Sequence, residues 1–286
     1  MAEPLRVMAS IKPLALMVEE LAGDRVEVTT LMKPGQTPHD FAFKVSDRQR
    51  LAEADVLIWV GATLEPYLAT LASYKTELSM AEVLNITAPQ HDNHQHGHRH
   101  DHVNGHELDN SHADQHYWLN PVHGTAMVIA IADKLAALDP EHAVTYSQNA
   151  ERMGQQLLAI SAQRLSAEGP VGDLTEPPVS RSRHYAVVHQ AFDYFLERFA
   201  YAQPMVLTPI PELSPGARQL RQAGQYLAPG DCVLVESRSP SKWVQTFAAR
   251  DGLKIKHVDI MGFEESVSTY AQLLENVITV FDECAG

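Results

Sequence analysis

Histidine is the residue whose distribution in this sequence most clearly points to chemistry. The chain has 15 histidines, and nine of them lie in one tract with aspartates and a glutamate interspersed. The tract contains His91, His94, His96, His98, His100, His102, His106, His112 and His116. Neutral imidazole is the commonest metal ligand and suits zinc, copper and nickel, while nearby carboxylates add negative potential. The tract therefore predicts contact with metal ions.

The composition of the tract also predicts a loop. From Gln90 to Ala113 its only large aliphatic residues are Val103 and Leu108, so burial could not offset the entropy lost on ordering it. A purification tag or a solvated polar insertion is the alternative, but a tag would be a continuous run at a terminus and this tract is internal. We expect an auxiliary metal-binding loop over residues 90–115, in which the first eight histidines act as weak ligands.

Three histidines have a more specific setting. His39 follows the second predicted strand, His116 closes the tract just before Tyr117 and Trp118, and His189 ends a later predicted strand. Ligands bind outside the carboxyl ends of the strands in open parallel sheets. One histidine at a strand end is more often a satisfied polar residue or a cap, but three together match the nitrogens of a tetrahedral zinc site. They are the candidate ligands of one tight site.

The elements that must position these histidines alternate between strand and helix. Apolar runs predict strands over residues 5–9, 26–31, 56–60, 83–86, 185–188, 232–235 and 253–258. Helical periodicity predicts helices near residues 14–21, 46–54 and 65 onward, then over 121–138, 141–167, 191–199, 215–227, 241–250 and 266–282, with Ser46 and Gln49 as a capping box. This pattern is typical of parallel α/β sheets covered on both faces.

The simplest architecture is two Rossmann-like α/β lobes joined by a long helix. We expect an N-terminal lobe over residues 1–139, a linking helix over 140–168 and a C-terminal lobe over 169–286. The cleft between two such lobes is the default place for a ligand. The metal site is therefore expected between the lobes.

Composition and charge narrow the class of protein. The chain has 286 residues, 45% hydrophobic and 20% charged, which excludes wholesale disorder. Its formal net charge of -14 argues against nucleic-acid binding and favours a cationic partner. No run of 18 uninterrupted apolar residues occurs, so no membrane-spanning helix is expected, and Met1 to Pro4 do not begin a signal peptide.

The chain has two cysteines, Cys232 and Cys284, and neither lies in a C-x-x-C motif. A cysteine zinc site or a thioredoxin-like motif is therefore not expected. One disulfide and two free thiols both remain open from the residues alone.

Six short segments, in order, resemble those of the zinc-binding proteins of bacterial ABC zinc importers (ZnuA-type), which are cluster A-I solute-binding proteins. They are residues 10–13 (SIKP), 38–41 (PHDF), 55–61 (DVLIWVG), 116–121 (HYWLNP), 188–195 (VHQAFDYF) and 212–215 (ELSP). The resemblance covers essentially the whole chain. It implies two α/β lobes bridged by a rigid helix, with a metal held between them.

The resemblance also implies residue roles. It places the three metal ligands on His39, His116 and His189, and imidazole at the third position suits zinc, whereas manganese-type relatives have a carboxylate there. The fourth ligand is water, Glu65, Asp259 or a histidine of the tract, because the match near Ser268 offers no carboxylate. The two cysteines align with a pair that is bridged in some zinc members. Such a disulfide would favour the oxidising periplasm as the location of the protein.

The functional hypothesis is therefore capture of Zn²⁺ in the periplasm and its delivery to an ABC importer permease, with no signal peptide retained. We expect a monomer that is not an enzyme, has one tight zinc site, and receives zinc from its loop or from periplasmic zinc donor proteins. Three histidines and a water also form the zinc site of some hydrolases, although no H-E-x-x-H is present and Glu236 is an unremarkable candidate base. A metal buffer or chaperone without a permease is the third alternative.

Overall fold

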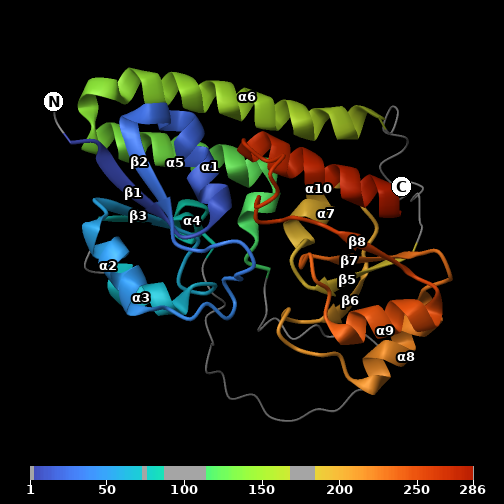
Figure 1. The fold of residues 1–286 in the computed structure, drawn as a ribbon. Coiled ribbons are helices and arrows are strands. Elements are labelled where there is room, and N and C mark those ends of the chain that lie inside the picture. Colours follow the sequence, from blue (N-terminus) through green and yellow to red (C-terminus); the bar gives the residue numbers. More distant parts are fainter. Residues whose placement is uncertain (1–2, 73–75, 87–113, 168–183, 286) are drawn as a thin grey trace, which may run out of the picture.

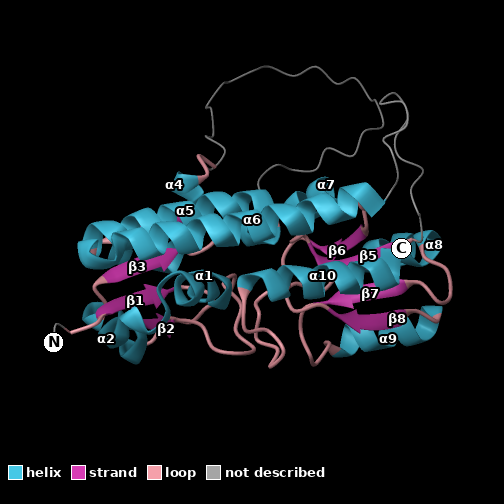
Figure 2. Ribbon diagram, turned by 90° about the horizontal axis from the view of Figure 1, so that it is seen from above, coloured by secondary structure: helices cyan, strands magenta, loops and turns pink. Residues whose placement is uncertain are grey.

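The described part of the chain contains two parallel four-stranded sheets that lie side by side (Figure 2). The computed structural model describes residues 3–72, 76–86, 114–167 and 184–285. The first sheet has the order β2-β1-β3-β4, and its strands are β1 (Leu5–Ala9), β2 (Val26–Thr30), β3 (Val56–Trp59) and β4 (Glu77–Ser79). The second has the order β6-β5-β7-β8, with β5 (Tyr185–His189), β6 (Met205–Thr208), β7 (Cys232–Val235) and β8 (Lys254–His257). We call the regions around these sheets the first and second lobe.

Helices cover both sheets (Figure 1). Those described are α1 (Lys12–Ala22), α2 (Val45–Glu53), α3 (Pro66–Ala72), α4 (Met80–Val83), α5 (Pro121–Leu138), α6 (Ala143–Ala167), α7 (Asp193–Phe199), α8 (Ala217–Tyr226), α9 (Lys242–Asp251) and α10 (Tyr270–Ala285), with short 3-10 turns η1 (Gly23–Arg25), η3 (Tyr117–Leu119) and η4 (Pro140–His142). The two parallel α/β lobes confirm the predicted fold class.

The long helix α6 extends over both lobes (Figure 1). It packs along α5 and contacts α1 of the first lobe and α7 and α10 of the second. This is the geometry expected of a stiff connector. The division of the chain at residues 139 and 168 stays a prediction.

Two local predictions were wrong, and one strand was missed. Residues 83–86 do not form a strand, because Val83 ends α4 and the edge strand β4 comes earlier. The strand β6 was not predicted. The N-cap of α2 is Lys44, whose backbone N–H donates to the Asp47 carboxylate at 2.9 Å, so Ser46 already lies inside the helix and cannot cap it.

Helix α5 alters the expectation about membranes. Among the described helices it is the one long and apolar enough, by length and composition, to cross a membrane. The prediction counted uninterrupted apolar residues and so overlooked its mean hydropathy. Its buried side chains, among them Met127, Val128, Ile131 and Leu135, belong to the hydrophobic core of the protein.

One hydrophobic core continues through both lobes. It joins residues of β1, α1 and β3 to residues of β5, α7 and α10, while a smaller cluster lies between the second sheet and α8 and α9. A disulfide between Cys232 of β7 and Cys284 of α10 ties the second sheet to the last helix, with a Cα–Cα distance of 5.6 Å. The cysteine pairing implied by the family resemblance is therefore confirmed.

Candidate metal centre

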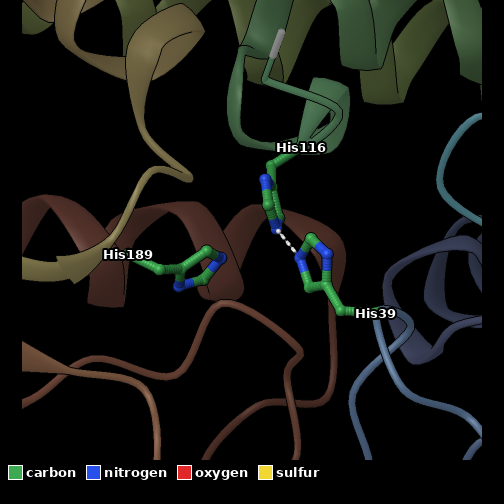
Figure 3. Close-up of side chains that lie close together, drawn as sticks. All are labelled: His39, His116 and His189. Atoms are coloured by element: carbon green, nitrogen blue, oxygen red, sulfur yellow. Dashed lines mark hydrogen bonds between the residues drawn. The ribbon is translucent and has the colours of Figure 1, made fainter. Parts of the chain in front are cut away.

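The three candidate histidines meet between the lobes (Figure 3). His39 lies in the loop after β2, His116 directly precedes η3, and His189 is the last residue of β5. One nitrogen of each ring lies within 4.8 Å of one nitrogen of the others, and the Nε2 atoms of His39 and His116 are 3.4 Å apart. Three converging imidazole nitrogens are a ligand set suited to zinc.

A buried carboxylate orients the ring of His116. Asp114 Oδ1 accepts a hydrogen bond from the His116 backbone N–H at 2.8 Å and lies 2.7 Å from its Nδ1. Burial alone would raise the pKa of Asp114, but the hydrogen bonds that its carboxylate accepts from His116 and from the backbone N–H of Asp193 help to lower it below the usual value. The carboxylate therefore stays ionised beside the ring, as in the carboxylate–histidine pairs that support metal ligands.

A second carboxylate faces His189. Glu236 follows β7, the neighbour of β5, and its Oε1 lies 2.7 Å from His189 Nδ1 but outside hydrogen-bond geometry. Burial, the largest single effect, lowers the pKa of His189, but the carboxylate of Glu236 together with the charges of Asp114 and Glu212 raises it above the usual value. Within the described part of the chain, neither ring nitrogen of His189 has a hydrogen-bond partner, although the residue is only 1% exposed. Unpaired buried nitrogens are unfavourable, so this ring is well placed to bind a cation.

His39 is held differently. Its backbone N–H donates to Thr37 Oγ1 at 3.2 Å, and its side chain is more exposed than those of His116 and His189. Burial, followed by repulsion from the other two rings, lowers the pKa of His39 to about 3. The ring is therefore neutral at physiological pH and can donate a lone pair to a metal.

The segment after His116 is anchored in both lobes. Trp118 Nε1 donates to the carbonyl of Ile260 at 2.8 Å, and the Trp118 carbonyl accepts from the hydroxyl of Tyr270. The backbone N–H of Tyr270 in turn donates to Glu20 of α1 at 2.6 Å. These contacts fix the backbone next to His116 between α1 and α10.

Both carboxylates considered as a fourth ligand have other partners. Glu65 is fully buried, and its Oε2 accepts from the backbone N–H of Val60 at 2.7 Å. Asp259 accepts from three backbone amides in the turn of residues 261–264. Neither belongs to the group of three histidines found among the described residues. The histidines from His91 to His112 lie outside those residues.

Asp114 and Glu236 were not predicted as partners of the candidate ligands. Asp114 was counted with the acidic residues of the tract, and Glu236 was considered only as a catalytic base. The signal for Asp114 was its place two residues before a candidate ligand. The signal for Glu236 was its position after a strand, at the same sheet edge as His189.

Comparison with known proteins agrees with this geometry. Residues 7–284 match the family model described as zinc-uptake complex component A, periplasmic. The chain belongs to this family. Its match to the ZnuA family confirms the resemblance found in the sequence.

Individual relatives span most of the chain. The high-affinity zinc uptake system protein ZnuA of Yersinia pestis is 29% identical over 80% of this chain and 74% of that protein. The protein of the same name from Paracoccus denitrificans is 27% identical over 100% of this chain and 93% of its own. A Zn(II)-bound variant of AdcAII from Streptococcus pneumoniae has a TM-score of 0.76 at 22% identity and covers 99% of both chains, which supports the fold.

Proposed function

We propose that this protein captures Zn²⁺ in the periplasm with His39, His116 and His189 and delivers it to the membrane permease of an ABC zinc importer. The observation that carries the proposal is the convergence of three imidazoles, of which the buried His189 ring has no hydrogen-bond partner for either nitrogen among the described residues. Membership of the ZnuA family supports the transport role. An all-imidazole set favours zinc over manganese or magnesium, which prefer oxygen ligands.

The proposal also covers the fourth ligand, the histidine tract and the source of the zinc. The fourth position is filled by water or by a histidine of the tract, because neither Glu65 nor Asp259 belongs to the group of ligand atoms that lie within 4.8 Å of one another. The tract binds further zinc ions weakly and passes them to the three-histidine site. The protein works as a monomer, and the loop or periplasmic donor proteins supply its zinc.

The test is a competitive titration with Zn²⁺, Mn²⁺, Ni²⁺ and Cu²⁺, followed by native mass spectrometry for stoichiometry. One tight zinc ion is expected in the full chain and in a variant that lacks residues 91–112. Replacement of each of the three histidines by Ala is expected to weaken zinc binding by orders of magnitude. Tight binding that survives all three replacements, or is lost with the loop, would contradict the proposal.

Two assays separate the alternatives. Zinc-dependent turnover of ester, peptide or phosphate substrates would favour a hydrolase. Zinc transfer to the cognate permease in proteoliposomes is expected for the importer role, and its failure with an active permease would leave a metal buffer.

A further inference from the structure

Asp114 makes contacts on both sides of its carboxylate. It is 5% exposed, and Oδ1 faces the backbone N–H and Nδ1 of His116, as described above. The other oxygen, Oδ2, accepts from the backbone N–H of Asp193 at 2.8 Å. Asp193 is the first residue of α7 and lies four residues after His189. One buried side chain thus contacts His116 and also the backbone of the segment that follows His189.

The contact with His116 fixes the position of its ring proton. A carboxylate only accepts hydrogen bonds, so the ring nitrogen that faces it at 2.7 Å, Nδ1, carries the proton. Nε2 then has a free lone pair, and this is the atom that lies 3.4 Å from Nε2 of His39. With the opposite tautomer, Nε2 would carry a hydrogen and could not bind a metal.

The contact with Asp193 sets the place of this ring relative to the second lobe. The N–H group at the first position of a helix has no partner within that helix and needs one from outside. Asp114 supplies it from the chain segment that carries His116. The distance between the second and third ligands is therefore held by the side chain that also selects the tautomer.

We propose that Asp114 is a positioning residue for zinc: it presents Nε2 of His116 to the metal and holds that ring in register with the segment that follows His189. The inference deepens the proposed function and rests on it. It assigns part of the zinc affinity to a carboxylate that does not itself touch the metal. Loss of such a partner typically weakens metal binding about 10–100-fold.

Replacement of Asp114 by Asn is the informative change. All three groups that face Asp114, the two N–H groups of His116 and the backbone N–H of Asp193, are hydrogen-bond donors. An asparagine has one accepting oxygen and one NH₂ group, so it must turn a donor toward one side. The size of the side chain is kept while one of the two links is lost.

The matched control is Asp47→Asn. Asp47 is 6% exposed, accepts a backbone hydrogen bond from Lys44 and pairs with Arg50, but it contacts none of the three histidines. Zinc affinity is measured by competition with a chelator of known affinity for the wild-type protein and for both variants. We expect a zinc Kd 10–100-fold higher for Asp114→Asn and an unchanged Kd for Asp47→Asn.

The second measurement is long-range ¹H–¹⁵N NMR of the imidazole rings in zinc-free protein, with His116 assigned from its loss in His116→Gln. The wild-type His116 ring is expected as the Nδ1–H tautomer, and Asp114→Asn is expected to populate the Nε2–H form. A wild-type Nε2–H tautomer overturns the inference even if the variant fails to fold. So does a folded Asp114→Asn protein with wild-type affinity and tautomer. Absence of tight zinc binding in the wild-type protein would instead refute the proposed function.

Discussion

Glu65 is a buried carboxyl group whose titration can be predicted from its surroundings. It is fully buried, and the backbone N–H groups of Val60 and Gly61 donate to its Oε2 at 2.7 and 3.4 Å. Burial raises the pKa of Glu65 from 4.5 to about 7, although these hydrogen bonds act in the opposite direction. Replacement of Glu65 by Gln keeps an accepting oxygen for the two amides but removes the ionisable group.

The sign and size of the effect follow from this shift. Because the pKa is higher in the folded protein, the folded state binds the proton more tightly than the unfolded state. The stabilisation is fully present below pH 4.5 and is lost as the pH rises through about 7. The gap between the two pKa values corresponds to about 3 kcal/mol of unfolding free energy. The Glu65→Gln variant has no ionisable group at this position, so its unfolding free energy does not fall for this reason as the pH rises.

The assay is urea unfolding of both proteins in metal-free buffer from pH 4.5 to pH 8. Other groups titrate in this range, so the difference between the two proteins is the quantity of interest. Relative to the wild type, the variant is expected to gain about 3 kcal/mol between these limits. A difference that stays constant with pH would refute the reasoning. The zinc Kd at pH 7.5 is expected to be the same for both proteins, since an increase of orders of magnitude would make Glu65 a metal ligand.

Three further changes test other contacts. Replacement of Cys232 and Cys284 by Ser opens a loop of 52 residues and is expected to lower the unfolding free energy by about 4 kcal/mol in urea titrations, with little change in zinc Kd. Gly124→Ala places a Cβ 2.5 Å from the hydroxyl of the buried Tyr270, so we expect a loss of about 1–3 kcal/mol in the same assay; equal stability would show that this ring can move. Glu236→Gln removes the charge beside the third histidine and is expected to raise the zinc Kd about 10–100-fold in chelator competition, and an unchanged Kd would assign Glu236 no part in zinc binding.

The strands that sequence analysis located are those with continuous apolar runs, such as Val56–Trp59 and Cys232–Val235. Strand β6 (Met205–Thr208) was missed because a proline stands on each side of it, and this pattern is typical of a loop. Strand β4 (Glu77–Ser79) has three residues at a sheet edge, and only Leu78 among them is a large apolar residue. Such short edge strands depend on pairing with a neighbour more than on their own composition.

The candidate ligands could be predicted because of their places near the ends of predicted strands or of the histidine tract. His39 follows a strand of the first sheet and His189 ends a strand of the second, and ligands bind outside the carboxyl ends of the strands in parallel sheets. The roles of Asp114 and Glu236 could not be predicted, because they depend on contacts between distant segments of the chain. Asp114 contacts Asp193 across 79 positions of sequence, and Glu236 meets His189 only because β5 and β7 are neighbours in the second sheet.

The shared hydrophobic core has a consequence for how metal enters and leaves. Swinging the lobes apart would expose side chains such as Trp118 and Tyr270 to water, at about 25 cal/mol for each Å² of apolar surface. A wide separation of the two lobes is therefore disfavoured, and the three histidines already lie close together. At the proposed site, exchange of the ion would then depend on movement of a loop that carries one of the three histidines. The loop after β2 carries the most exposed of them, His39.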